Sequence, residues 1–168
     1  MPIDRVHPHP DPEAPLDALD RRILGLFGAE PKIGVLEASR RLQVARGTVQ
    51  ARLDRMERSG VITGWSPSVS TVALGYTVTA FVTCEIAQQA GRERVTRHLR
   101  SIPEVLEVWT VTGPGDLWCR LVAHSNDDLQ RVIDDVVGDP GILRTTTLIG
   151  LAEQIPFRTE PLVAAPRR

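Results

Sequence analysis

Apolar residues recur at helical spacing through the first third of the chain. The first such set lies three or four residues apart and consists of Leu16, Leu19, Ile23 and Leu26. This spacing predicts an amphipathic helix, which has two aspartates at the favourable N-terminal end of its dipole. Residues 35–42 predict a short second helix that turns Leu36 and either Ala38 or Ser39 toward the core.

A third helix is predicted from about residue 45 to residue 59. Its buried stripe recurs at i, i+4 and i+7 and consists of Val49, Leu53 and Met56. Gly60 follows at the position where a left-handed residue ends a helix. Because only Gln43 and Val44 separate the second and third helices, the three together predict a helix-turn-helix.

From residue 79 the pattern changes from helical spacing to alternation. One face of the first predicted strand holds Ala80, Val82, Cys84 and Ile86, and the other holds Phe81, Thr83 and Glu85. Further strands are predicted over residues 105–112, 116–123 and 142–151, and helices over 91–102 and 125–137. The Gly-Pro-Gly turn between the second and third strands favours a hairpin. The order βαββαβ predicts a ferredoxin-like unit, in which both helices cover one face of an antiparallel sheet.

The predicted fold class is therefore α+β, with an N-terminal winged helix-turn-helix followed by a ferredoxin-like βαββαβ dimerisation and effector domain. The expected parts are a disordered tail (1–15), a helix-turn-helix domain (16–62), a wing strand and linker (63–78), the ferredoxin-like domain (79–153) and a C-terminal tail (154–168). The first tail is expected to be disordered because its fifteen residues include five prolines and few apolar side chains.

The predicted sheet has one face that its own helices do not cover. Phe81, Trp118 and Val122 lie together on that face, or Leu117 and Leu121 do if the register is shifted by one residue. Either register leaves apolar side chains exposed. A second copy of the same sheet is the simplest cover, so we expect a homodimer, and dimerisation would give two DNA-reading helices related by a two-fold axis.

Charge is distributed unevenly along a chain whose formal net charge is only −1. Residues 17–60 sum to +3, whereas residues 79–153 sum to −4. Within residues 40–58, six arginines face only Asp54 and Glu57. Charge runs are most often solvated helix faces or i,i+4 ion pairs. Here the asymmetry favours contact between the first domain and a polyanion.

The face of the third helix opposite its apolar stripe predicts where double-stranded DNA would bind. The expected DNA-binding residues are Arg40, Arg41, Arg46, Gly47, Thr48, Gln50, Ala51, Arg52 and Arg55. The small residues among them allow close approach to a groove. Arg46 and Gln50 near the N-terminus of the helix are expected to reach base edges, while longer basic side chains reach the phosphate backbone.

Several stretches of the chain resemble the Lrp/AsnC family of transcription regulators. They are "LDALDRRIL" from Leu16, "RRLQVARGTVQARLDRMERSGVITGW" from Arg40, "LG" at 74–75, "PEV" at 103–105 and "VTGPGD" at 111–116. The resemblance covers roughly residues 16–151, in the family's order and spacing. It implies a DNA-binding regulator that forms dimers or rings of dimers (tetramer or octamer) and that is modulated by a small molecule, usually an amino acid.

The same resemblance implies an effector site near the loop between the second and third strands of the ferredoxin-like domain. The expected residues are Thr112, Gly113, Pro114, Gly115, Asp116, Thr145 and Thr147. Glycine amides can hold a carboxylate, and one aspartate can hold an ammonium group. Alternatively, the glycines only form the turn and Asp116 only caps it. Family members often carry a bulky residue before the aspartate and hydroxyl N-caps where this chain has Gly34 and Ala45.

Other functional classes find little support in the sequence. No catalytic or metal-binding residues are expected, since there is no phosphate loop, nucleophile elbow or metal-ligand pair, and no cofactor is expected. Cys84 and Cys119 are expected to be reduced core thiols. The uncharged stretch 61–84 is too rich in Ser and Thr for a membrane span, and the N-terminus lacks a secretion signal, so a cytoplasmic location is expected. An effector-independent architectural DNA-binding protein is the remaining alternative.

Overall fold

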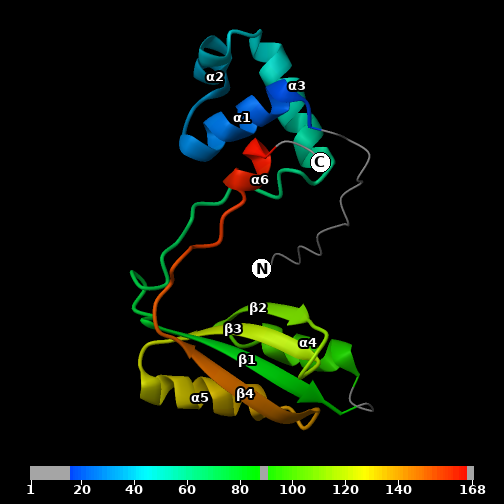
Figure 1. Ribbon diagram of the computed structural model, residues 1–168, viewed down its shortest axis with the longest axis vertical. Coiled ribbons are helices and arrows are strands. Elements are labelled where there is room, and N and C mark those ends of the chain that lie inside the picture. The colour runs from blue at the N-terminus through cyan, green and yellow to red at the C-terminus, as the bar shows by residue number, and fades with distance from the viewer. Residues whose placement is uncertain (1–15, 88–90, 166–168) are drawn as a thin grey trace. The chain divides into compact units, whose positions relative to one another are not determined.

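The computed structural model describes residues 16–87 and 91–165. The chain divides into two compact units, residues 1–67 together with 156–168 and residues 68–155. Helices build the first unit, and a four-stranded sheet with two helices builds the second (Figure 1). The disordered tail predicted over residues 1–15 lies outside the described residues.

The first unit contains the three predicted helices, α1 (Ala18–Ala29), α2 (Val35–Leu42) and α3 (Arg46–Arg58). Its core consists of Ile23, Phe27, Ala38, Leu42, Val49, Leu53 and Met56. The predicted stripe of α3 is confirmed, because all three of its apolar residues are buried. The prediction for Leu36 is wrong: its side chain is 50% exposed, since Ala38 and Ser39 take the buried face of α2.

Local chemistry sets where these helices begin and end. Asp17 and Asp20 form a capping box at the start of α1, each side chain accepting from the other's backbone N–H at 2.9 Å. Gly34 and Ala45 provide no side-chain cap for α2 and α3, as predicted. Gln43 adopts a left-handed conformation in the turn between them, and Gly60 does so after α3 with a φ of 72°.

Residues 61–77 contain no strand in the single chain, so the structure does not show the wing strand predicted there. A strand needs a neighbouring edge to pair its N–H and C=O groups, and no described segment of this chain supplies one here. Within the first unit, Trp65 instead packs edge-on against Phe27 and donates its indole N–H to Glu57 at 2.6 Å.

A short helix also occupies part of the predicted C-terminal tail. Helix α6 (Glu160–Ala164) belongs to the first unit and packs against α1 (Figure 1). Its five residues are too few for a periodic apolar pattern, so the sequence offers no signal for it.

The second unit is the predicted ferredoxin-like fold. Strands β1 (Val78–Ile86), β2 (Val105–Thr110), β3 (Leu117–Ala123) and β4 (Ile142–Gly150) form an antiparallel sheet in the order β2-β3-β1-β4. Helices α4 (Arg92–Arg100) and α5 (Asn126–Val137) pack on the sheet (Figure 1). Ser125 caps α5, as predicted, by accepting from the Asp128 N–H at 3.1 Å.

The core between sheet and helices follows the predicted alternation. The strands supply Ala80, Val82, Cys84, Leu117, Cys119, Leu121 and Ala123, and the helices supply Val95, Leu99, Leu129, Val132 and Val136. The two cysteines are buried free thiols. A hydrogen bond with the Cys84 thiol, together with burial, raises the pKa of Cys119, so the Cys119 thiol stays protonated. Both cysteines serve as packing in this core.

The opposite face of the sheet has the first of the two predicted registers. Pairing places Thr83 opposite Trp118, Phe81 opposite both Arg120 and Leu148, and Trp109 opposite Trp118. The Phe81 and Trp118 rings stack with their centroids 5.4 Å apart. Leu148 is 65% exposed and Trp109 is 57% exposed, so an apolar surface remains uncovered in the single chain.

Candidate nucleic-acid interface and ligand loop

The N-terminal half of α3 presents the predicted DNA-reading residues to solvent. Arg46, Gly47, Gln50 and Ala51 are exposed and Thr48 is half-buried. The burial of Val49 and Leu53 on the opposite side of the helix forces this arrangement. The first turn of α3 contains no acidic residue, so no carboxylate within that turn neutralises Arg46. The result is a narrow strip with one cation, one amide and two small residues.

Arg52 and Arg55, which are also predicted DNA-binding residues, form ion pairs with aspartates at the start of α1. Arg52 pairs with Asp17 and, at 3.1 Å, with Asp20, and Arg55 also pairs with Asp20. The Asp20 side chain is fully buried, and the two guanidinium groups cover it. Asp17 and Asp20 at the start of α1 therefore hold Arg52 and Arg55 on α3, and the two arginines are only partly available for phosphate.

Sequence reasoning missed this network because the paired aspartates and arginines are 32 or 35 positions apart. A signal does exist: the two aspartates are three residues apart on one helix, and the two arginines are three residues apart on another. Residues at that spacing lie on the same face of a helix. Matching acidic and basic pairs on neighbouring helices could therefore have suggested the contact.

Electrostatics within this network favour the charged forms. The Asp20 N–H, together with the Arg52 guanidinium, lowers the pKa of Asp17 to about 2. Hydrogen bonds to Asp17 and Asp20 raise the pKa of Arg52. The Asp17 carboxylate thus remains ionised and paired with Arg52 across the neutral pH range.

The two arginines at the end of α2 also differ from each other. Arg41 is bound to Glu30 and, through its Nε at 3.1 Å, to Glu37, and these carboxylates raise its pKa. Arg40 is 70% exposed and lies 3.8 Å from Glu37, beyond hydrogen-bond distance. Of the two, Arg40 is the side chain that can move to a phosphate without breaking a short ion pair.

The loop between β2 and β3 has the geometry of a constrained turn. Gly113 and Gly115 have φ values of 111° and 93°, which glycine adopts without strain. A Cβ on Gly115 would lie 3.2 Å from the Thr83 side chain and 3.3 Å from the Cys84 carbonyl oxygen. Gly115 is therefore required by both its conformation and its close approach to β1.

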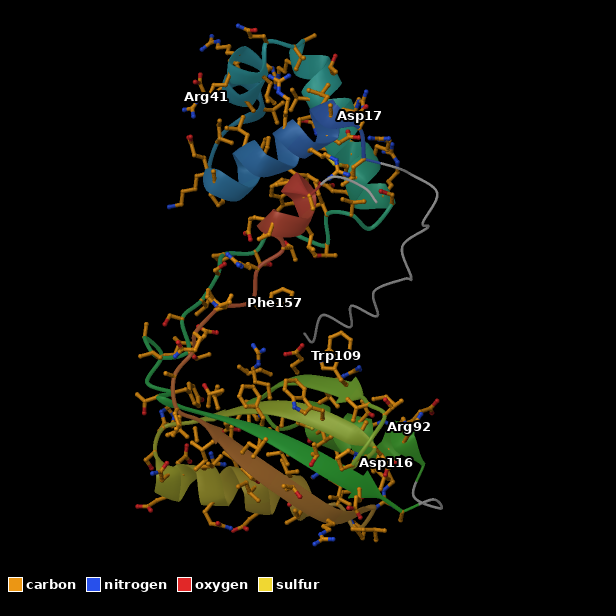
Figure 2. All side chains as sticks on the ribbon, viewed as in Figure 1. Asp17, Arg41, Arg92, Trp109, Asp116 and Phe157 are labelled. Carbon is orange, nitrogen blue, oxygen red and sulfur yellow. The ribbon has the colours of Figure 1, made fainter. Side chains whose placement is uncertain are left out.

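Asp116 is already engaged by the end of β1 (Figure 2). Its backbone N–H donates to the Cys84 carbonyl at 2.8 Å, and its Oδ2 accepts from the Ile86 N–H at 2.7 Å. One carboxylate oxygen thus fixes the loop to the strand. The other oxygen makes no hydrogen bond among the described interactions and can accept from a ligand.

The structure does not bring all seven predicted effector residues together. Residues 112–116 are contiguous, and Thr112, Gly113 and Pro114 are exposed. Thr145 and Thr147 pair with Cys84 and Val82 across β1, which places both hydroxyls on the face packed by α4 and α5. Because β1 lies between β3 and β4, Thr145 is about 10 Å from the loop.

Both units match known family models. Residues 16–63 match the winged helix-turn-helix DNA-binding model, and residues 77–159 match the Lrp/AsnC ligand binding domain. The HTH-type transcriptional regulator FL11 of Pyrococcus horikoshii is 29% identical over 82% of this chain and 90% of its own length. An uncharacterised HTH-type regulator of Pyrococcus abyssi is 32% identical over 80% of this chain and 85% of its own.

Solved structures show the same architecture. Escherichia coli AsnC superposes with a TM-score of 0.81 at 29% identity, covering 88% of this chain and 99% of that one. A transcriptional regulator from Neisseria meningitidis, solved as a complex with L-methionine, superposes with a TM-score of 0.78 at 22% identity over the same shares. With a DNA-reading unit and a ligand-binding unit in this order, the chain belongs to the Lrp/AsnC family of DNA-binding transcription regulators and not to a class of enzymes.

Proposed function

We propose that this regulator reads base edges with Arg46, Thr48 and Gln50, while Gly47 and Ala51 allow the helix to approach the groove. The observation that carries the proposal is the exposed strip on the N-terminal half of α3, which has no acidic residue in its first turn. An arginine and an amide are the side chains that read guanine and adenine in the major groove. As a protein that binds DNA, it would act in the cytoplasm.

Backbone contacts in this proposal come mainly from Arg40, with smaller contributions from Arg41, Arg52 and Arg55. The last three would have to share their guanidinium groups between phosphate and the carboxylates that they already bind. Arg40 is less restricted, because its ion pair with Glu37 is 3.8 Å long. Phosphate contacts position a protein on DNA and carry no sequence information.

Binding to duplexes selected from random sequence tests this division of roles. We expect Gln50→Ala or Arg46→Ala to lose discrimination at one base pair, by about 1–3 kcal/mol. We expect Arg40→Ala to weaken binding to every duplex and to reduce the salt slope by about 1. Arg97→Ala on α4 is the matched control. Equal losses on all duplexes for all three variants would contradict the assignment.

We further propose that two copies of the chain associate through the open face of the sheet. The exposed Trp109 and Leu148 and the stacked Phe81 and Trp118 support this dimer. Leu148→Glu is expected to yield monomers in light scattering, whereas Val137→Glu on the helix-covered side is expected to leave the dimer intact. Assembly of dimers into tetramers or octamers would appear in the same measurement.

The proposed effector is an amino acid, bound at residues 112–116. The free oxygen of Asp116 and the exposed Gly113 backbone support an ammonium and a carboxylate contact. The methionine complex of the Neisseria relative is of the same ligand class. Calorimetry with a panel of L-amino acids tests this, with Asp116→Asn expected to weaken any binding observed.

The second candidate is an architectural DNA-binding protein without an effector. The loop between β2 and β3 supports it, because formation of the turn is enough to explain why the chain has Gly113, Pro114 and Gly115 there. Competition with unrelated DNA separates the two candidates. A regulator keeps its site under competition, whereas an architectural protein is displaced by any duplex.

A further inference from the structure

The C-terminal helix is held on the first unit by one arginine of α1. Arg21 donates from Nη1 to the Val163 carbonyl at 2.6 Å and to the Ala165 carbonyl at 3.1 Å. These carbonyls are among the last of α6, which have no partner within a helix. Arg21 therefore binds the C-terminal end of α6 in the way a cation satisfies a helix terminus.

Gly28 of α1 lies close to the first residue of α6. A Cβ on Gly28 would lie 3.8 Å from the Glu160 side chain, at ordinary contact distance. Figure 1 draws α6 alongside α1, in agreement with the packing of the two helices. The contact leaves the N-terminal half of α3 exposed, so it does not cover the proposed reading strip.

The chain consequently passes between the two units twice. It runs first from α3 through residues 59–77 to β1, and it runs again from β4 through residues 151–159 to α6. Thr79 at the start of β1 is paired with Gly150 at the end of β4. Both connecting segments therefore leave the sheet at one corner, from two adjacent strands.

The first segment is anchored at that corner. The Tyr76 and His124 rings stack with centroids 4.1 Å apart, and His124 Nδ1 lies 2.9 Å from the Gly75 carbonyl oxygen. Thr77 Oγ1 donates to the His124 carbonyl at 2.9 Å. The last residues of this segment are thus fixed to the end of β3, within the second unit.

We infer that Arg21 and α6 form an intrachain clasp, so that two covalent segments instead of one tie the DNA-reading unit to the β1–β4 corner of the ligand-binding unit. Arg21 is the positioning residue. Neither family match, at residues 16–63 and 77–159, extends to α6. A single flexible segment would let the reading unit reorient freely, whereas two segments that start together restrict it.

Paramagnetic relaxation measures the clasp in the full-length protein without DNA. Leu162 is 73% exposed and both native cysteines are buried, so a nitroxide on Leu162→Cys labels α6 selectively. The amide signals of Gly25 and Gly28 on α1 are expected to be strongly broadened when the label is on the same chain. Arg21→Ala is expected to restore these signals, and Arg97→Ala is the matched control that leaves them broadened.

Mixed samples distinguish this clasp from an exchange of helices between copies. When ¹⁵N-labelled chains without nitroxide are mixed with unlabelled chains that carry it, α1 signals are expected to remain sharp. Broadening only in the mixed sample, or none in the single-chain sample, would overturn the inference. Unchanged amide signals of α2 and α3 in the Arg21→Ala sample establish that the variant is folded. Deletion of residues 156–168 removes α6 and is a second variant without the clasp.

Discussion

At the scale of single residues, the buried carboxylate of Asp20 is the main determinant of how the reading helix is held. It accepts from Arg52, Arg55 and the Asp17 N–H while its own side chain is fully buried. Removing one partner of a buried ion pair leaves the charge of the other partner without compensation. Asp20→Ala is therefore expected to lower the free energy of unfolding of the first unit by about 3 kcal/mol.

Urea unfolding followed by circular dichroism measures this loss. Asp54→Ala is the matched control, since within the described residues Asp54 accepts one hydrogen bond, from Gln50 at 2.7 Å, on the exposed side of α3. We expect that control to change stability by less than about 0.5 kcal/mol. A similarly small change for Asp20→Ala would mean that water replaces the carboxylate and that Arg52 and Arg55 are free for DNA.

Asp17 gives the first unit an acid-sensitive step. Its pKa in the folded protein is about 2, below the ordinary value of 3.8, so its contribution to stability is present above pH 4 and is lost as the pH falls toward 2. We expect the melting temperature to fall over that interval, and Asp17→Asn to flatten the decrease. An unchanged slope in the variant would assign the acid sensitivity to other carboxylates, such as Asp128 and Asp139 in the second unit, whose pKa values are also lowered.

At the scale of helices and strands, the uncapped starts of α2 and α3 offer a matched pair of substitutions. Gly34 and Ala45 both have extended φ and ψ values that suit an N-cap residue, yet neither supplies an acceptor. Ala45→Ser is expected to stabilise the first unit by about 1 kcal/mol, and Gly34→Ser by only a few tenths. Thermal unfolding of both variants measures the difference, and equal gains would show that capping is not the cause.

The elements that periodicity predicted are those whose own residues determine them. The Val49, Leu53 and Met56 stripe fixed α3 and thereby the exposed strip around Arg46 and Gln50, because burial of one helix face exposes the other. What the pattern missed depends on distant partners: Asp20 for the arginines, Arg21 for α6, and a neighbouring edge for the absent wing strand. The buried face of α2 consists of Ala38, Ser39 and Leu42 and leaves Leu36 outside the core.

At the scale of the whole molecule, β1 connects the two places where regulation would act. At its C-terminal end the Ile86 N–H donates to Asp116 of the β2–β3 loop, and at its N-terminal end Thr79 is paired with Gly150 beside both connecting segments. Its nine residues span about 30 Å of the second unit. A ligand that shifts the loop would therefore act on the same strand from which the reading unit is tethered.

If two connecting segments restrict the reading unit, then the dimer should be selective for the distance between its two half-sites. The full-length protein is expected to prefer one spacing near a helical turn, about 10–10.5 base pairs or a multiple of it. Deletion of residues 156–168 leaves a single segment per chain, so each reading helix reaches a wider range of positions. Binding to a series of duplexes, in which the distance between half-sites increases by one base pair at a time, measures this selectivity.

We expect the deletion to broaden the range of preferred spacings while leaving affinity for an isolated half-site unchanged, because α3 itself is untouched. Identical spacing profiles for the two proteins would mean that the first segment alone, fixed by Tyr76 and His124, sets the position of the reading helix.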